Sequence, residues 1–155
     1  MATNSAALIM SIISQIEASD FDRLYEIEQQ AHLVPWSFGT LKNNQGDRYL
    51  NLKLIENDQI IGFAICQIVL DEATLFNIAI LPSHQGNGLG KLLLNELIAQ
   101  LKEKGVQTLW LEVRESNPAR FLYEKIGFNE VDIRKNYYPK PSGGRENAVV
   151  MACYL

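Results

Sequence analysis

The chain has 155 residues and a formal net charge of −4, and 47% of its residues are hydrophobic. These values are typical of a globular protein, and we expect one domain over residues 1–155. The acidic balance argues against direct nucleic-acid binding, because nucleic-acid-binding proteins usually carry a basic face. The two cysteines, Cys66 and Cys153, are too few for a disulfide framework and favour a reducing cytoplasm.

The chain begins with an apolar stretch that leads into a predicted strand. Residues 6–13 are too few to cross a membrane and lack the basic flank of a signal peptide, so no membrane association is expected. The strand is expected over 11–16.

Two helices are predicted next. Over 21–31, apolar residues recur at helical spacing after Ser19 or Asp20, either of which can cap a helix by accepting a backbone N–H. A shorter helix is expected over 38–43, capped by Ser37.

The middle of the chain predicts a run of strands followed by a helix. Strands are expected over 49–55, 59–69 and 72–80, and the short polar turns between them favour an antiparallel meander. A helix is expected over 89–104, ended by Gly105 in the left-handed conformation. The residues expected on its buried face are Leu89, Leu92, Leu93 and Leu97.

The last third predicts a strand, a helix and a closing pair of strands. The strand 108–113 follows a connection of helix length, so it should pair parallel with 72–80. Asn117 and then a proline are typical of the start of a helix. Strands 128–134 and 148–154 should flank a long polar loop. The expected fold is α/β or α+β, with helices on both faces of a mixed sheet.

The glycine-rich turn between residues 80 and 91 carries the main functional signal. Glycines let backbone N–H groups approach a ligand closely, and a helix N-terminus favours an anion, so the turn is typical of a phosphate site. A Walker loop would need four residues between Gly86 and Gly90 and a hydroxyl after Lys91, and a dinucleotide fingerprint would need glycine at Lys91. The competing interpretation is an ordinary strand–helix connection.

The same turn, Gln85-Gly-Asn-Gly-Leu-Gly90, matches in full the Gln/Arg-x-x-Gly-x-Gly/Ala pattern of the coenzyme A pyrophosphate loop in the Gcn5-related N-acetyltransferase (GNAT) family. Residues 122–128, Leu-Tyr-Glu-Lys-Ile-Gly-Phe, match the Leu-Tyr-x-x-x-Gly-Phe element of that family. The chain therefore resembles a GNAT enzyme. The resemblance implies the GNAT fold, a mostly antiparallel sheet of about seven strands with a parallel central pair, acetyl-CoA as cosubstrate, and no metal.

Four further stretches, 44–46, 70–79, 109–114 and 136–139, resemble the branch of the family that acetylates the N-terminal alanine of a small-subunit ribosomal protein. This similarity covers nearly the whole chain after residue 11. It implies a ribosomal-protein N-terminus as the partner, bound between residues 33–38 and the closing hairpin. A monomer is expected.

The resemblance also implies roles for particular residues. Glu112 would be the general base that takes a proton from the amine, helped by burial in its strand, and Tyr123 the acid that protonates the leaving thiolate. A backbone N–H within 77–80 would stabilise the oxyanion. The residues implied to bind coenzyme A are Ile78, Ala79, Ile80, Gln85, Gly86, Asn87, Gly88, Leu89, Gly90, Lys91 and Asn117.

Two departures from the family pattern stand out. Gly86 replaces a basic residue, and the spacing from Asn117 to Tyr123 is one residue shorter than usual, a difference that Pro118 would absorb at the helix start. A GNAT enzyme acting on a lysine side chain or small amine, and a non-catalytic acyl-CoA-binding module, are the alternatives. His32 and His84 lack a triad or metal pattern and are interpreted as structural.

Overall fold

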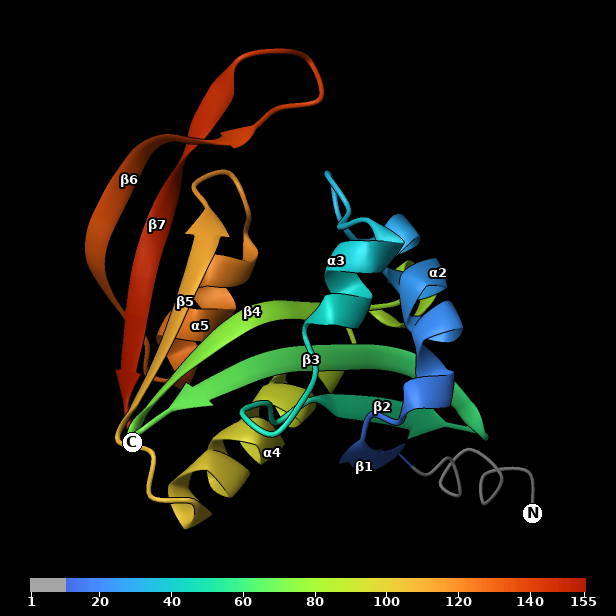
Figure 1. The fold of residues 1–155 in the computed structure, drawn as a ribbon. Coiled ribbons are helices and arrows are strands. Elements are labelled where there is room, and N and C mark those ends of the chain that lie inside the picture. Colours follow the sequence, from blue (N-terminus) through green and yellow to red (C-terminus); the bar gives the residue numbers. More distant parts are fainter. Residues whose placement is uncertain (1–10) are drawn as a thin grey trace.

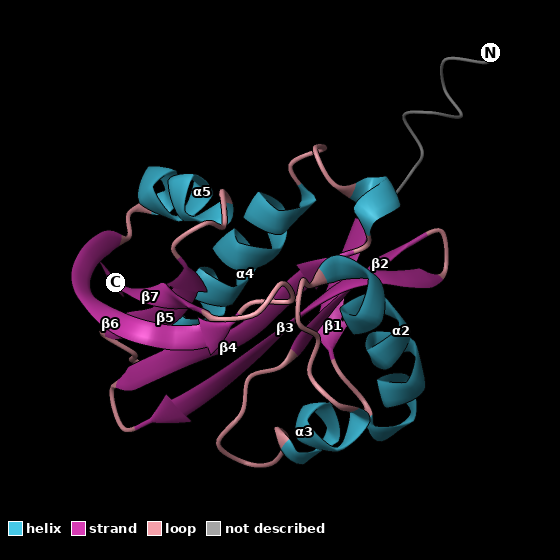
Figure 2. Cartoon of the chain, turned by 90° about the horizontal axis from the view of Figure 1, so that it is seen from above, coloured by secondary structure: helices cyan, strands magenta, loops and turns pink. Residues whose placement is uncertain are grey.

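The computed structural model describes residues 11–155, which form one seven-stranded sheet with helices on both faces (Figures 1 and 2). The strand order is β1-β2-β3-β4-β5-β7-β6. The strands are β1 (Ser11–Gln15), β2 (Leu52–Glu56), β3 (Gln59–Val69), β4 (Glu72–Ile80), β5 (Thr108–Arg114), β6 (Asn129–Pro139) and β7 (Arg145–Tyr154). The helices are α2 (Phe21–Ala31), α3 (Phe38–Asn43), α4 (Leu89–Glu103) and α5 (Ala119–Ile126), with short 3₁₀ turns η1 (Ala18–Asp20) and η2 (Pro82–His84).

The predicted mixed sheet is confirmed. β4 and β5 pair parallel across the α4 crossover, and all the other neighbours in the sheet pair antiparallel. Figure 2 shows α4 and α5 on one face and α2 and α3 on the other. The apolar stretch 6–13 lies largely outside the described residues. Within residues 11–155, no helix is both long and apolar enough to span a bilayer.

The parallel pair covers only part of each strand. β4 and β5 are paired from Glu72 with Thr108 to Leu75 with Leu111. Beyond that point β4 continues to Ile80 beside β3, and β5 continues to Arg114 beside β7. The two strands therefore diverge, as Figure 1 shows.

The strand predicted over 49–55 begins later than expected, at Leu52. Asn51 accounts for the difference, because its side chain takes over local hydrogen bonds. Its Oδ1 accepts the Cys66 N–H at 3.1 Å, and its Nδ2 donates to the Asn44 carbonyl at 2.8 Å. Tyr49 forms only an isolated bridge, with Gln67.

The closing strands are longer than predicted, so the expected long polar loop is limited to residues 140–144. β6 lies at the edge of the sheet and nearly all its residues are exposed. An edge strand can be polar on both sides, so it lacks the alternation from which strands are recognised in sequence.

Two local predictions about helices are wrong. Leu92 is 44% exposed, because the buried stripe of α4 runs through Leu93, Leu94, Leu97 and Leu101, and Leu92 lies about 100° around the helix from Leu93. Neither candidate cap contributes a capping hydrogen bond to α2. The Asp20 carboxylate instead pairs with Lys53 of β2 at 2.7 Å.

Gly62 lies where β3 packs tightly against β4. A Cβ at this position would be 2.5 Å from Cδ1 of Ile80 and 2.8 Å from the carbonyl oxygen of Ala79. We expect Gly62→Ala to lower the free energy of unfolding by about 1–3 kcal/mol, because the backbone of β4 must shift. Urea unfolding followed by circular dichroism measures this.

Gly39→Ala in α3 is the matched control, because a Cβ there meets nothing within 4 Å. That variant should be unchanged or slightly more stable. Equal unfolding midpoints for both variants would contradict the tight packing at Gly62.

Candidate active site

A cavity of about 500 Å³ opens where β4 and β5 diverge. Its lining comes from both faces of the sheet, with residues of α2 and the loop after it on one side and Asn117, Pro118 and Tyr123 on the other. Residues from the diverging strands and from the end of β6 complete the wall, among them Asn77, Ile78, Glu112, Arg114, Tyr138 and Pro139.

The backbone of β4 presents hydrogen-bonding groups to this gap. The Leu81 N–H donates to the Ile61 carbonyl at 2.8 Å. Ladder bonds in an antiparallel pair alternate along the strand. The amides of Ile78 and Ile80 therefore point away from β3, toward the gap, whereas that of Ala79 points to β3. Of the four positions expected to offer a backbone donor, 77–80, Ile78 and Ile80 have the required direction.

Glu112 lies on the face of β5 opposite to that of its buried neighbours Leu111 and Val113. Its side chain lines the cavity. The sequence predicted that this side chain would be buried, but 27% of it is exposed. Its Oε1 forms an ion pair with Nε of Arg134 at 2.9 Å. The Glu112 charge is also the main cause that raises the pKa of the neighbouring Tyr137 hydroxyl.

Tyr123 and Asn117 line the same cavity from α5 and from the turn before it. Pro118 lies between Asn117 and the helix start at Ala119, and Asn117 Oδ1 accepts the Ala119 N–H at 2.9 Å. Tyr123 is buried, and burial together with Tyr138 raises its pKa to about 12. Its hydroxyl is therefore protonated at neutral pH and can donate a proton.

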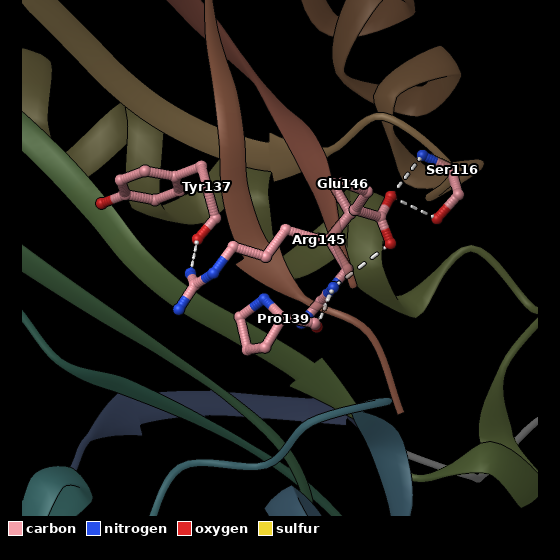
Figure 3. A network of polar contacts seen from close by, with 6 residues as sticks. Ser116, Tyr137, Pro139, Arg145 and Glu146 are labelled. Carbon is pink, nitrogen blue, oxygen red and sulfur yellow. Dashed lines mark hydrogen bonds and ion pairs between the residues drawn. The ribbon is translucent and has the colours of Figure 1, made fainter. Parts of the chain in front are cut away.

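The β6–β7 wall is fastened to the end of β5 by a polar network (Figure 3). Glu146 Oε1 accepts the N–H and the hydroxyl of Ser116 at 3.1 and 2.7 Å. Arg114 donates to Glu146 Oε2 at 3.2 Å and to the Pro139 carbonyl at 2.9 Å. These bonds hold the pKa of Glu146 below its usual range, with those from Ser116 as the main cause.

An irregularity in β6 gives its two adjacent tyrosines different positions. The register shifts between Arg134 and Tyr138, and Asn136 has a φ of 52°. Such bulges re-aim side chains next to functional sites. Tyr138 is half-buried against the cavity with the Arg114 guanidinium 4.7 Å from its ring, whereas Tyr137 is exposed.

The glycine-rich turn lies beyond the end of β4 and does not line the cavity. Gln85 Nε2 donates to the Ile80 carbonyl at 2.9 Å, which joins the turn to the diverging end of the strand. Gly86 and Gly88 have φ values of 83° and 78°, and a Cβ on either would meet nothing within 4 Å. Gly90 instead lies near Ile80 and Leu122.

This turn fits an anionic group. Residues 85–88 and Lys91 are exposed, and the first-turn amides of α4, those of Leu89, Gly90 and Lys91, have no acceptor within the helix. Their N–H groups and the helix dipole favour a phosphate. The structure thus has a candidate phosphate cradle at one end of β4 and a candidate reaction cavity beside the same strand.

Sequence reasoning missed a buried polar group on the other wall of the cavity. Glu28 is 1% exposed and bonds to the Trp36 backbone and to Asn77, which in turn contacts His32. His32 was interpreted as structural, yet it lines the cavity. The sequence did carry a signal for this group, because helical spacing places Glu28 on the inward face of α2.

Residues 11–155 offer neither a cluster of metal ligands nor a reactive thiol at Cys66. No group of three or more His, Cys, Asp or Glu side chains in this part of the chain could hold a metal ion. Cys66 is fully buried in β3, and burial raises its pKa to about 12. Its thiol is therefore a poor nucleophile.

The acetyltransferase (GNAT) family model matches residues 12–128. The chain belongs to this family, which confirms the resemblance seen in the sequence. A [ribosomal protein bS18]-alanine N-acetyltransferase from Haemophilus influenzae is 91% identical over 146 residues, covering 94% of this chain and all of the relative.

More distant relatives agree. The enzyme of the same name from Escherichia coli is 56% identical over 144 residues, covering 92% of this chain and 97% of the relative. The crystal structure of the ribosomal-protein-S18-alanine N-acetyltransferase from Escherichia coli superposes with a TM-score of 0.90, at 55% identity and 94% coverage of both chains. The fold is therefore that of the family.

Gly88→Val should abolish coenzyme A binding, because a branched side chain fills the space that a pyrophosphate needs beside the amides. Isothermal titration with coenzyme A measures this. Gly105→Val is the matched control, since Gly105 has a similar φ of 82°, equally open surroundings and a position at the other end of α4. Both variants carry similar backbone strain, so a loss of affinity in Gly88→Val alone is due to the filled space beside the amides. Unchanged coenzyme affinity in Gly88→Val would exclude this turn as the pyrophosphate site.

Proposed function

We propose that this chain transfers the acetyl group of acetyl-CoA to the N-terminal alanine of ribosomal protein bS18, as a single-domain cytoplasmic enzyme. The 91% identity to a relative named for this reaction, over the full length of that relative, is the observation that carries the proposal. The cavity supports it, because acid–base groups line the cavity and the candidate phosphate cradle lies at the end of β4, a strand that also lines it.

The divergence of β4 and β5 gives the two substrates separate approaches. The glycine turn and α5 lie on one face of the sheet, and the loop after α2 and the β6–β7 hairpin border the cavity from the other side. We assign acetyl-CoA to the first side, with its pyrophosphate on residues 85–91 and its acyl end beside Ile78. The peptide N-terminus enters between Leu33–Trp36 and Tyr138.

Amide formation needs a neutral amine, a stabilised oxyanion and a protonated leaving thiolate. The Ile78 amide is assigned to the oxyanion, because ladder alternation points it into the gap. Glu112 is assigned as the base that takes a proton from the attacking amine. Tyr123, protonated at neutral pH, is assigned as the acid for the thiolate. Direct transfer agrees with the burial of Cys66.

The test of the function is an acetylation assay with a peptide that begins Ala-Arg-Tyr. We expect free thiol to appear with acetyl-CoA and this peptide, and to disappear when the peptide N-terminus is blocked. Mass spectrometry places the acetyl group. Acetylation of a lysine side chain would support the alternative acceptor, and coenzyme binding without turnover of any amine would support a non-catalytic module.

Tyr123→Phe should slow the transfer by roughly 10²–10⁴-fold, the usual contribution of an acid–base group. Because the pKa of Tyr123 is raised to about 12, its ionisation should not reduce the wild-type rate below that pH. Initial rates of thiol release at saturating acetyl-CoA measure both effects. Tyr25→Phe on α2, whose ring packs on Phe38 at 5.5 Å, is the control. A loss of less than about threefold in Tyr123→Phe would remove this residue from the mechanism.

A further inference from the structure

A buried carboxylate joins three segments on the acceptor side of the cavity. Glu28 Oε2 accepts the Trp36 backbone N–H at 2.9 Å, and Glu28 Oε1 accepts from Asn77 Nδ2 at 3.0 Å. The other end of the same amide, Asn77 Oδ1, is 2.8 Å from His32 Nε2. Glu28, Asn77 and His32 all line the cavity.

These contacts determine which nitrogen of His32 carries the proton. A carboxylate can only accept hydrogen bonds, so Asn77 must direct its NH₂ group to Glu28 and its oxygen to His32. His32 Nε2 must then be the donor, which leaves Nδ1 of the neutral ring with a free lone pair. Among the hydrogen bonds of residues 11–155, none involves this Nδ1.

The proposed acetyl transfer needs two proton acceptors at the amine nitrogen. The α-ammonium loses one proton before it can attack, and the nitrogen loses a second after the new C–N bond forms. One of these protons is assigned to Glu112. In this structure the Glu112 carboxylate forms an ion pair with Arg134 at 2.9 Å. Imidazoles are closer in proton affinity to an α-amino group than carboxylates are.

We propose that His32 removes the first proton, from the peptide ammonium, through Nδ1, and that Glu28 and Asn77 are positioning residues that keep Nδ1 unprotonated. This inference rests on the proposed function. In the step, an N–H bond of the ammonium breaks, its electron pair stays on the amine nitrogen, and a new N–H bond forms at Nδ1.

The product of this step is stabilised by the same network. The imidazolium keeps its Nε2–H bond to Asn77 Oδ1, and its positive charge lies 3.5 Å from Glu28 Oε1. The ring is partly exposed, with 31% of the side chain accessible, so the proton can leave to solvent. The second proton goes to Glu112, and Tyr123 protonates the thiolate.

The pH profile of His32→Gln tests this role. Without His32, only peptide that arrives with a neutral amine reacts. An α-amino group with a pKa of 7.7–8.0 is about one-tenth neutral at pH 7, so the variant should lose about tenfold there and approach the wild-type rate near pH 9.5. The other ionisable groups that line the cavity, Glu28, Glu112, Arg114, Tyr123 and Tyr138, are the same in both proteins.

Glu28→Gln tests the positioning with a nearly isosteric change. A glutamine can donate its NH₂ to Asn77 Oδ1, which turns the Asn77 NH₂ toward His32 Nε2 and moves the ring proton to Nδ1. Nitrogen-15 NMR of the imidazoles should show the Nε2–H form of His32 in the wild type and the Nδ1–H form in Glu28→Gln. The chain has two histidines, so His84→Gln assigns the signals.

Glu28→Gln should reproduce the pH-dependent loss of His32→Gln. Glu26→Gln is the control on the same helix, because Glu26 is 61% exposed and does not line the cavity. A wild-type Nδ1–H tautomer would overturn the network. An active wild type with no loss at pH 7 in His32→Gln, or with an equal loss at every pH, would overturn the proton transfer alone. A wild type that does not acetylate the peptide would overturn the proposed function and the proton transfer with it.

Discussion

The separation of β4 from β5 beyond Leu75 and Leu111 is the constraint on which the site depends. Opening a sheet leaves backbone donors and acceptors without ladder partners, which is costly when they are buried. Here each strand keeps one neighbour, β3 for β4 and β7 for β5, so half of the ladder remains. Gln85 also bonds to the Ile80 carbonyl, one of the groups that the separation frees.

Two carboxylates hold the walls on either side of this gap. Glu28 connects α2, the loop at Trp36 and β4, while Glu146 connects β7 with Arg114 and Ser116 at the end of β5. Charge-assisted hydrogen bonds of this kind are stronger than neutral ones and fix orientation. The gap is therefore lined by side chains with few alternative positions, which suits a reaction that needs several groups aligned at once.

The geometry also explains how one strand can serve both substrates. β4 ends at the glycine turn, so the candidate phosphate cradle and the free amides of Ile78 and Ile80 follow one another along a single backbone. Asn77, on the same strand, faces the acceptor side through His32 and Glu28. A displacement of β4 would affect the proposed donor and acceptor positions together, and β4 is held closely by the tight packing of Gly62 against Ile80.

Much of this molecule follows from local sequence. The family was identified from the Gln85–Gly90 turn and residues 122–128, and the parallel pairing of β4 with β5 from the length of the crossover between them. The turn is recognisable because the left-handed backbone at Gly86 and Gly88 strongly favours glycine. The roles assigned to Glu112 and Tyr123 remain predictions, although both residues line one cavity.

The errors arose where distant residues decide a local outcome. The strand predicted over 49–55 begins only at Leu52, because the Asn51 side chain bonds Asn44 and Cys66. The edge strand β6 is exposed along nearly its whole length and shows no alternation of buried and exposed residues. Local patterns determined the helices, the strands and the glycine-rich turn, since these depend on backbone preference within a few residues. Only the tertiary structure brought His32, Asn77 and Glu28 together and paired Glu112 with Arg134, because such contacts join side chains up to 49 positions apart.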